Sequence, residues 1–404
     1  MKQSPAPSGV YPNMDHMKNL LKNRPKVFVA MSGGVDSSVA AALLQKQGFR
    51  VVGVFFKPWQ PENGAVYCNW QQDRLDAMRV ASILGIPFKT WDFSKEYGRK
   101  VAKYMIDSYR KGTTPNPDVM CNKEIKFGLF LERALAEGAD YIATGHYARM
   151  QAVSVKLISN KRAEKKSLSF YYDRGNLIVA ETVKLLKAKD RNKDQSYFLW
   201  TLTQKQLKYC LFPIGDYTKP EVRRLAKKFG LPNHDKKDSQ GVCFVGPLDM
   251  KDFLKSYIRP KTGEIRLLAG DKAIGRHDGV YYYTIGQRHG LNITDGGGPY
   301  YVVAKDIGKN IIYVADSVNS GELSDDKAMV AKVSWVSGEP ELPLRAEVKI
   351  RYRAQTVPAL VIKNGSPRSL LIKFAKPVRA ITPGQSAVFY RGEAVLGGGV
   401  ISSW

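Results

Sequence analysis

The stretch Ser32-Gly33-Gly34-Val35-Asp36-Ser37-Ser38 could bind phosphate groups. It holds two glycines and three serines between an apolar run and an Ala/Leu-rich segment. Exposed amides and hydroxyls at the positive end of a helix dipole form an anion site. The Gly-Lys-Ser/Thr ending of the common ATPase loop, which holds the β- and γ-phosphates, is absent. The alternative is a Gly/Ser turn that binds nothing, and the flanking strand and helix patterns favour phosphate binding.

Two of the four cysteines, Cys121 and Cys243, lie in stretches suited to thiol chemistry. Cys121 follows a proline-rich loop and precedes a helix that we expect to start near Asn122. Because a helix N-terminus and a neighbouring Lys123 both stabilise a thiolate, we expect a lowered pKa for this thiol. Asp118 could accept or donate a proton if the loop folds back. Cys243 lies in a polar loop with a glycine on either side, which could swing a thiol.

Each cysteine taken alone is more typical of a small buried apolar residue. That interpretation fits Cys210 best, and we extend it to Cys68. No Cys-x-x-Cys pair occurs in the chain. The sequence therefore favours neither a cysteine zinc site nor a disulfide framework, and we predict no metal-ligating residues.

The elements that must position these groups alternate between strands and helices. Apolar runs at 26–31 and 50–56, with a helix between them, form one βαβ unit around the loop. An amphipathic helix with Leu75, Met78, Val80, Ala81 and Leu84 on its apolar face is expected next. Further predicted elements are a strand at 88–93, helices at 96–111 and 124–137, and a strand at 140–146. This alternation predicts an α/β fold with a doubly wound parallel sheet and ligands at the carboxyl ends of its strands.

The second half of the chain changes texture. A short basic helix is predicted over 220–229, with proline in its first turn and Gly230 at its end. From about residue 265, short β-rich runs separated by turn signals predict a small C-terminal β-barrel. The runs lie at 280–285, 300–304, 311–314, 346–351, 370–374 and 386–390. We divide the chain into a disordered tail (1–25), an α/β domain (26–212), a linking domain (213–264, with a polar loop at 237–246) and a barrel domain (265–404).

The charge balance indicates a polyanionic partner. Lys and Arg number 63 against 37 Asp and Glu, a formal net charge of +26 over 404 residues. This excess favours nucleic acid over a generic basic surface. Residues 151–176 carry six basic and two acidic residues. They predict a solvated insertion, either an ordinary charged hairpin or a contact to RNA backbone. Since no signal-peptide pattern or long apolar run occurs, we expect a cytoplasmic protein.

Seven motifs follow one another along the chain and carry a family resemblance. They are Met-Ser-Gly-Gly-Val-Asp-Ser-Ser-Val, Thr-Pro-Asn-Pro-Asp-Val-Met-Cys-Asn-Lys-Glu-Ile-Lys-Phe, Ala-Thr-Gly-His-Tyr-Ala-Arg, Asn-Lys-Asp-Gln-Ser-Tyr-Phe-Leu, Lys-Lys-Asp-Ser-Gln-Gly-Val-Cys-Phe, Thr-Ile-Gly-Gln-Arg and Thr-Pro-Gly-Gln-Ser-Ala-Val-Phe-Tyr. The first resembles the signature of the PP-loop ATP pyrophosphatases. Together, over about residues 26 to 400, they resemble the tRNA-specific 2-thiouridylases, the MnmA family.

The resemblance implies a PP-loop catalytic domain, a small linking domain and a tRNA-binding β-barrel. It implies 2-thiolation of the wobble uridine in tRNAs for lysine, glutamate and glutamine. Cys121 matches the family's nucleophile, Cys243 its persulfide-carrying cysteine and Asp118 its acid/base aspartate. The positions that match ATP contacts are Ala30, Met31, Ser32, Gly33, Gly34, Val35, Asp36, Ser37, Phe56 and Gly145. Those that match tRNA contacts are Asn116, Pro117, Asp118, His146, Lys193, Asp194, Gln195, Arg351, Tyr352 and Gln385.

The implied chemistry needs ATP, Mg²⁺ and a protein that supplies persulfide sulfur. Adenylation would turn the uridine C2 oxygen into a good leaving group, and Mg²⁺ would screen the phosphates, with Asp36 either a metal partner or a cap of its loop. The two thiols would end as a disulfide. Ala30 and Phe56 stand where family members often have Gly and Met, which could alter adenine packing. The alternatives are another PP-loop adenylating RNA-modifying enzyme and a non-catalytic RNA-binding homologue.

Overall fold

The computed structural model describes residues 24–61, 70–153, 155–156, 169–173, 176–180, 182–238, 249–294, 297–316, 321–366 and 369–403. Cys68, Cys243 and the predicted tail up to residue 23 lie outside this part of the chain. Within it, no helix has both the length and the apolar character needed to cross a membrane.

A five-stranded parallel sheet forms the N-terminal part, as the alternation predicted. Its strands, in spatial order, are β10 (Cys210–Leu211), β4 (Tyr141–Thr144), β1 (Lys26–Ala30), β2 (Arg50–Lys57) and β3 (Phe88–Asp92). Successive residues of β1 enter opposite cores, with Phe28 on one face and Val27 and Val29 on the other. Burial on both faces explains why β1 and β2 are almost continuously apolar, whereas β3, at the edge, is mostly exposed.

Helices cover both faces of this sheet. One face carries α2 (Val35–Lys46), α3 (Trp70–Ile83) and α9 (Lys219–Lys228). The other carries two long helical runs. The first consists of α4 (Ser94–Tyr97), a π-helical turn (Gly98–Ala102) and α5 (Lys103–Arg110), and the second of α6 (Pro117–Cys121), a π-helical stretch (Asn122–Leu129) and α7 (Phe130–Ala136). Ser196–Leu199 is a 3-10 turn and α8 covers Gln204–Leu207. The alternating helices and strands confirm the predicted doubly wound fold.

Two local predictions for these helices are wrong. The second run begins at Pro117 and not near Asn122, because Asn116 caps it and Pro117 fits its first turn. Cys121 therefore lies inside the helix. On α3, Val80 and Ala81 are buried as predicted, together with Ala77, but Leu75 and Met78 are 37% and 38% exposed and do not belong to the buried face.

The C-terminal β-barrel is confirmed. Its strands are β15 (Ser324–Trp335), β16 (Leu344–Lys349), β17 (Val357–Lys363), β18 (Leu370–Arg379), β19 (Ser386–Arg391) and β20 (Ala394–Ser403). The order β15-β18-β17-β16-β19-β20 closes through pairing of β15 with β20. β20 also pairs with β9 (Val183–Leu186), which pairs with β5 (Arg149–Ala152). The barrel and the segment after β4 thus share one sheet.

The strands just after residue 263 form a separate, four-stranded sheet in the order β12-β11-β14-β13. They are β11 (Gly263–Leu267), β12 (Ala273–His277), β13 (Tyr301–Asp306) and β14 (Ile311–Ala315), preceded by α10 (Met250–Lys255). The strand predicted at 280–285 is wrong, because Val280–Tyr282 is a 3-10 turn that buries its apolar side chains without strand pairing. The predicted domain boundaries stay predictions.

The described part of the basic insertion is a small sheet of β6 (Val155–Lys156), β8 (Asn176–Ala180) and β7 (Ser169–Asp173). β7 and β8 pair antiparallel as a hairpin. A role of this insertion in RNA contact stays a prediction.

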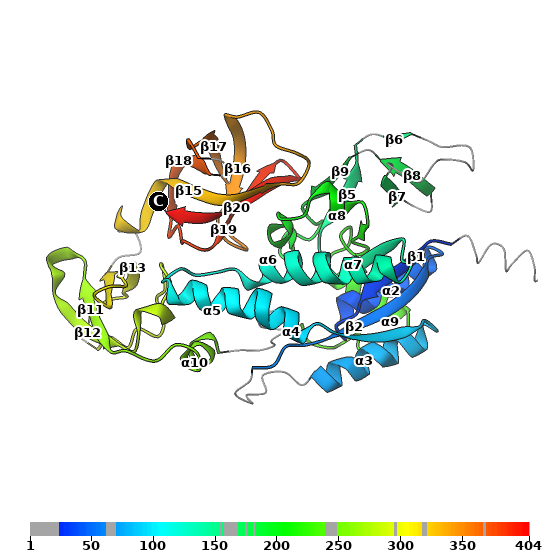
Figure 1. Ribbon diagram of the computed structural model, residues 1–404, viewed down its shortest axis with the longest axis horizontal. Coiled ribbons are helices and arrows are strands. Elements are labelled where there is room, and N and C mark those ends of the chain that lie inside the picture. Colours follow the sequence, from blue (N-terminus) through cyan, green and yellow to red (C-terminus); the bar gives the residue numbers. More distant parts are fainter. Residues whose placement is uncertain are drawn as a thin grey trace, which may run out of the picture.

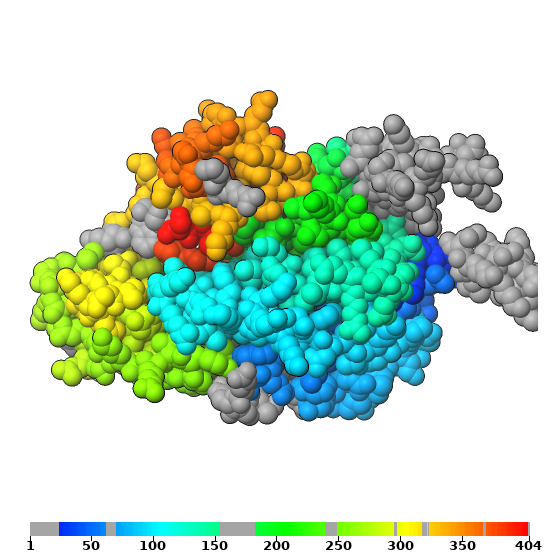
Figure 2. All heavy atoms as spheres, in the orientation of Figure 1, coloured from blue at the N-terminus to red at the C-terminus, as the bar shows by residue number. Residues whose placement is uncertain are grey.

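The two long helical runs tie the parts together. In Figure 1 they cross the centre of the molecule, with the parallel sheet at one end, the four-stranded sheet at the other and the barrel alongside. Figure 2 shows both helical runs, in cyan and blue-green, on the visible face below the barrel. Met105, Ile106 and Tyr109 of α5 belong to the core of the four-stranded sheet, so the contact between these parts is apolar.

The barrel rests on the loop that precedes α6. Thr114 donates its amide to the carbonyl of Pro383 at 2.9 Å, and the Gln385 side-chain amide donates to the carbonyls of Thr114 and Pro115 at 3.0 Å each. Nearby, Trp200 donates to the Ser386 hydroxyl at 3.0 Å. The barrel therefore fixes the loop on which the predicted catalytic residues depend.

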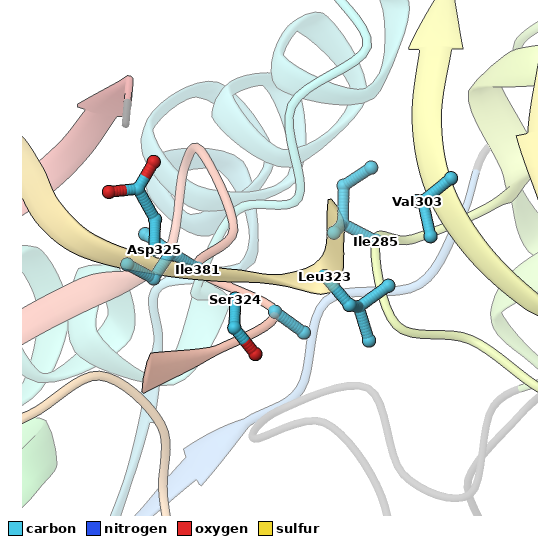
Figure 3. Close-up of a pocket in the computed structure, with 7 residues that line it drawn as sticks. Ile285, Val303, Leu323, Ser324, Asp325 and Ile381 are labelled. Atoms are coloured by element: carbon cyan, nitrogen blue, oxygen red, sulfur yellow. The ribbon is translucent and has the colours of Figure 1, made fainter. Parts of the chain in front are cut away.

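A small cavity lies where the barrel meets the four-stranded sheet (Figure 3). Its volume is about 10 Å³, and it is lined by Ile285, Val303, Leu323, Ser324, Asp325, Ala380 and Ile381. A space of this size holds at most about one water molecule. It is a packing defect in an apolar seam, not a ligand site.

Gly384 lies against the backbone of Thr114 in this loop, and we predict that Gly384→Ala loosens the contact. A Cβ atom there would lie 2.7 Å from the carbonyl oxygen of Thr114, and its φ is +93°. We expect a loss of about 1–3 kcal/mol in stability, seen as a lower thermal midpoint. Gly392→Ala is the matched control, because Gly392 also has a positive φ but open space around its Cβ position. Equal losses in both variants would contradict the role of the contact.

Candidate functional site

The phosphate loop lies at the carboxyl edge of the parallel sheet. Ala30, the last residue of β1, is in register with Val54 of β2 and Thr144 of β4. The segments that follow these three strands therefore share one edge, where doubly wound folds bind ligands. This edge brings Ser32, Gly145 and His146 into one region.

The loop folds around its own hydroxyls. Ser38 and Ser37 donate their hydroxyls to the carbonyl of Gly34 at 2.8 and 3.2 Å, and Gly34 donates its amide to the Ser32 hydroxyl at 3.4 Å. α2 starts directly after Gly34, and no side chain caps its N-terminus. An uncapped helix N-terminus leaves backbone donors and a partial positive charge for an anion.

Two glycines make room for this arrangement. Gly33 has a φ of +78°, and a Cβ atom there would lie 2.2 Å from the carbonyl oxygen of Asp73. At Gly145, a Cβ atom would lie 2.6 Å from the amide nitrogen of Ser37 in the first turn of α2. Only glycine lets the loop after β4 approach the helix N-terminus this closely. Both glycines are therefore required by close backbone contacts around the predicted phosphate loop.

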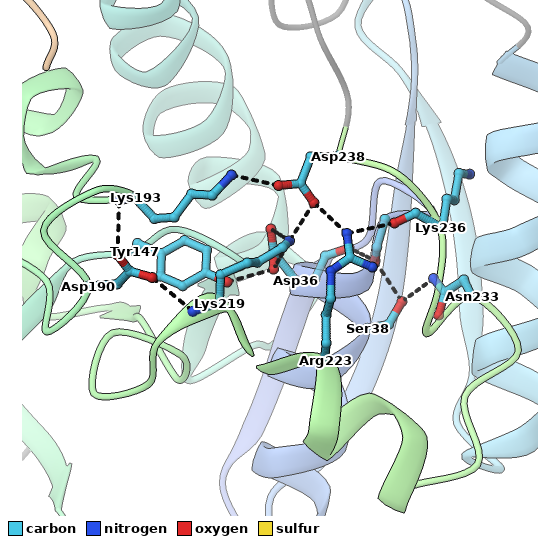
Figure 4. A network of polar contacts seen from close by, with 12 residues as sticks. Asp36, Ser38, Tyr147, Asp190, Lys193, Lys219, Arg223, Asn233, Lys236 and Asp238 are labelled. Carbon is cyan, nitrogen blue, oxygen red and sulfur yellow. Dashed lines mark hydrogen bonds and ion pairs between the residues drawn. The ribbon is translucent and has the colours of Figure 1, made fainter. Parts of the chain in front are cut away.

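Asp36 is bound by side chains from two other segments (Figure 4). It accepts hydrogen bonds from the Tyr147 hydroxyl at 2.8 Å and from Lys219 Nζ at 2.8 and 2.9 Å. It therefore does not cap its own loop, which was one of the two predicted roles. Within the described residues, no cluster of three or more His, Cys, Asp or Glu side chains is placed to hold a metal ion.

Lys219 continues the network to Asp238, which three cations surround. Asp238 pairs with Lys219 at 2.7 Å, with Lys193 at 2.6 Å and with Arg223 at 3.0 Å. Burial alone would raise the pKa of Asp238, but the hydrogen bonds from Lys193 and Lys219 outweigh burial and lower it to about 2. Burial and the charge of Asp36 raise the pKa of Tyr147 well above its usual range. The Asp238 carboxylate is therefore charged and the Tyr147 phenol protonated at neutral pH.

Asn233 and Lys236 support the loop from behind. Asn233 donates its side-chain amide to the carbonyl of Gly33 at 2.9 Å and to the Ser38 hydroxyl at 3.0 Å. Lys236 pairs with Asp73 at 2.7 Å and Asp76 at 2.6 Å on α3. The segment that precedes the loop of Cys243 is thus anchored to the phosphate loop itself.

The predicted thiol site begins the second helical run. The Asn116 side chain accepts the amide of Val119 at 3.2 Å, and Pro117 occupies the first helical turn. Asp118 is partly exposed on that turn, whereas Cys121 is 0% exposed. The predicted roles of Cys121 and Asp118 stay predictions, as does that of Cys243, which lies outside the described residues. The structural interpretation of Cys210 is confirmed, since its thiol is buried and donates to the carbonyl of Gln206 at 3.2 Å.

Several predicted RNA contacts are held by internal hydrogen bonds. Asp194 accepts the amide of Ala188 at 2.9 Å and the Ser196 hydroxyl at 3.0 Å. Gln195 accepts the amide of Tyr147 at 2.9 Å. These side chains shape the turn after Asp190 and orient Tyr147 toward Asp36.

The barrel residues predicted to contact RNA lie near the same turn. Arg351 donates to the carbonyl of Ala380 and to the Thr382 hydroxyl, and burial lowers its pKa. Tyr352 packs against Phe198, with ring centroids 4.5 Å apart. Tyr352 therefore connects the barrel to the turn that carries Gln195, and its role in RNA binding stays a prediction.

His146 and Phe56 are buried at the sheet edge. His146 Nδ1 lies 2.7 Å from the Thr144 hydroxyl, and burial, helped by the charge of Lys126, lowers its pKa well below the usual range. Phe56 packs edge-on against Phe93 and Phe130, with centroids 5.5 and 4.8 Å away. Met31 is also buried, and Ala30 is partly buried.

Six polar residues of the site escaped prediction: Tyr147, Lys219, Arg223, Asn233, Lys236 and Asp238. Tyr147, Lys236 and Asp238 lie inside two of the quoted motifs, so the motifs included their positions although their residue types alone suggested no role. Lys219 and Asn233 have no such signal, because each reaches the loop from a segment about 180 residues or more away.

Comparison with known proteins places these parts in one family. Family models match residues 25–247 (tRNA methyl transferase HUP domain), 251–316 (tRNA methyl transferase PRC-barrel domain) and 325–401 (Aminomethyltransferase beta-barrel domain). The tRNA-specific 2-thiouridylase MnmA of Bacillus licheniformis is 45% identical over 381 residues, 93% of this chain and 94% of that protein. Its namesake in Geobacillus thermodenitrificans is 44% identical over 95% of this chain and 96% of that protein, and that of Listeria monocytogenes is 44% identical over 94% and 95%.

Gly145→Ala should weaken nucleotide binding, because its Cβ would displace the first turn of α2. We expect a loss of about 1–3 kcal/mol, up to about 100-fold in the dissociation constant for ATP by titration calorimetry. Gly308→Ala serves as the control, since its Cβ would meet its nearest neighbour at an ordinary 3.5 Å. Unchanged ATP affinity in Gly145→Ala would show that the cradle does not hold the nucleotide.

His146 should make stability depend on pH. Its pKa is depressed in the folded state, so below about pH 6.5 the unfolded chain binds a proton that the folded chain does not. Stability should therefore fall as pH drops below 6.5, by up to about 1.4 kcal/mol per pH unit from this group. Melting curves from pH 7 to 5 should show a shallower fall in His146→Gln than in wild type. His289→Gln, at an exposed histidine, should keep the wild-type slope.

Proposed function

The chain belongs to the tRNA-specific 2-thiouridylase family, and from this premise we propose that it replaces the C2 oxygen of the tRNA wobble uridine with sulfur in an ATP-dependent reaction. The observation that carries the proposal is the phosphate cradle of Gly33, Gly145 and the uncapped α2 N-terminus, in a chain related to thiouridylases over nearly its whole length. A methyl donor with a sulfonium centre would have no use for this anion site.

ATP supplies the activation, by turning the C2 oxygen into a phosphate-linked leaving group. The backbone of Gly34, Val35 and Ser37 would hold the phosphates at the α2 N-terminus. Mg²⁺ would arrive with the nucleotide phosphates, since Asp36 is already paired with Lys219 and Tyr147. Asp118, partly exposed on the first turn of α6, would take the proton released from the base.

Sulfur transfer would use Cys243 and Cys121. The outer sulfur of a Cys243 persulfide attacks C2, and the activated oxygen leaves with its bonding electrons. The Cys121 thiolate then attacks Sγ of Cys243, the sulfur–sulfur bond breaks, and its electron pair stays on the sulfur bound to C2. The resulting Cys121–Cys243 disulfide needs an external thiol for reduction. Because Cys121 is fully buried, its side chain must be uncovered before it reacts.

Two partners follow from this chemistry. The substrate is tRNA, and acceptors for lysine, glutamate and glutamine are those the family resemblance implies. The net charge of +26 suits a polyanion whose binding weakens steeply with salt. A sulfur-donor protein must load Cys243, and both partners fit a cytoplasmic enzyme.

The test is a reconstituted reaction with ATP, Mg²⁺, a sulfide source and unmodified tRNA for glutamate, followed by digestion and mass spectrometry for 2-thiouridine. Product that depends on ATP supports the proposal. ATP turnover and tRNA binding without product would overturn the thiolation and leave another PP-loop RNA modification.

Cys121→Ser and Cys243→Ser should each abolish 2-thiouridine formation, because each removes one of the two cysteine sulfurs that form the sulfur relay, Cys243 as persulfide carrier and Cys121 as the thiolate that releases the product. ATP and tRNA binding should stay within about twofold of wild type, because neither cysteine side chain is among the proposed phosphate contacts. Cys210→Ala is the matched control, since Cys210 is a buried cysteine outside the relay and should keep activity. Normal product from either relay variant would sink the mechanism.

A further inference from the structure

We propose that Lys219 binds the β- and γ-phosphates of ATP, the part of the nucleotide that leaves as pyrophosphate. Lys193 and Arg223 hold Asp238, the second carboxylate that Lys219 contacts. The inference rests on the proposed function, because it assigns a residue to the same ATP site.

The loop itself lacks the cation that this task needs. In the common ATPase loop, a lysine near the end of the motif reaches the β- and γ-phosphates. Here the corresponding stretch is Gly33-Gly34-Val35-Asp36-Ser37, which holds no basic residue. A polyphosphate at the α2 N-terminus would carry several negative charges beyond the reach of a helix dipole, whose effect falls off within one turn. Another segment must supply the charge.

Lys219 supplies it from the start of α9. Its side chain is 11% exposed, and its ammonium group lies 2.8 Å from Asp36 Oδ1 in the first turn of α2. The same group lies 2.7 Å from Asp238. The cation is thus held at the open end of the phosphate loop although it is 183 residues away along the chain.

The cluster holds as many cations as carboxylates. Lys193, Lys219 and Arg223 lie among Asp36, Asp238 and Asp190, so the side-chain charges balance. The dipole of α2 adds the positive charge that favours an anion. Replacing a buried ion pair by apolar side chains is often neutral or stabilising, so stability alone gives a weak reason for such a cluster. Binding of an anionic ligand to Lys219 would give a direct reason for the cluster.

Asn233 ties the phosphate loop to the segment of Asp238. The residue is 5% exposed and donates its side-chain amide to the carbonyl of Gly33 and the hydroxyl of Ser38. Its carbonyl oxygen has no hydrogen-bond partner among the described residues, and as an acceptor it suits a hydrogen-bond donor and not a phosphate oxygen. Asn233 and Asp238 lie in the same short segment, which therefore fixes both the loop and the cation beside it.

The chemical role of Lys219 follows from the bonds that change. The uridine C2 oxygen forms a bond to the α-phosphorus, while the bond from that phosphorus to the oxygen bridging to the β-phosphate breaks. Pyrophosphate departs with the bonding pair, and the N3 proton of the base is released. A cation at the departing oxygens stabilises the charge that develops there. No oxidant or reductant is required.

The test compares dissociation constants of the full chain for ATP, inorganic pyrophosphate and AMP by titration calorimetry. Lys219→Met should weaken ATP and pyrophosphate binding about 10-fold or more, and AMP binding by less than about threefold, because AMP lacks the groups that Lys219 contacts. Lys219→Arg keeps the charge and should restore most of the preference for ATP. Arg223→Gln should give a smaller loss in the same direction.

Lys251→Met is the control. Lys251, on α10, pairs with Asp278 at 3.1 Å and has no contact with the phosphate loop, so the ratio of ATP to AMP affinity should stay at the wild-type value. Melting curves identify any variant that fails to fold. Equal weakening of ATP and AMP in Lys219→Met, or wild-type pyrophosphate affinity, would overturn the inference. Wild-type protein that binds no ATP would instead overturn the proposed function.

Discussion

The ion-pair network centred on Lys219 is the interaction on which the rest of the site depends. Through Asp36 it fixes the first turn of α2, and through Asp238 it fixes the segment that leads to the loop of Cys243. Tyr147, in the segment after β4, donates its hydroxyl to Asp36 as well. The phosphate loop, the segment after β4 and the segment that leads to Cys243 thus meet in one cluster of charges.

The barrel is part of the site and not an appendage. Gln385 and Pro383 hold the loop at Thr114 by three hydrogen bonds, and that loop leads into the helix of Cys121. Trp200 and Tyr197 bond to Ser386 from the turn that also carries Gln195. Pro383, Gln385 and Ser386 are near neighbours in the chain, in the turn before β19 and at its first residue, so one short stretch of the barrel contacts both the loop of the thiol helix and that turn.

The sequence predicted the parts that local pattern determines. The βαβ unit, the parallel sheet and the barrel follow from apolar periodicity and turn residues, which require no knowledge of distant contacts. The start of the thiol helix was missed because the Asn116 cap was not recognised, so Pro117 was assigned to a loop instead of the first helical turn. The strand expected at 280–285 failed because an apolar run does not distinguish a strand from a buried turn.

The polar network could not be predicted for a different physical reason. Lys219 and Asn233 act through contacts across about 180 to 200 residues, and their local sequence resembles any helix start or turn. Motif matching did find Asp194, Gln195 and Gln385, but as RNA contacts, whereas each makes a hydrogen bond that shapes the protein. A side chain can do both only if its remaining polar atoms face the RNA. Asp194 is buried, and its carboxylate accepts three hydrogen bonds within the protein, so few acceptor positions remain for an RNA contact. Its place in the motif is better explained by folding than by RNA recognition.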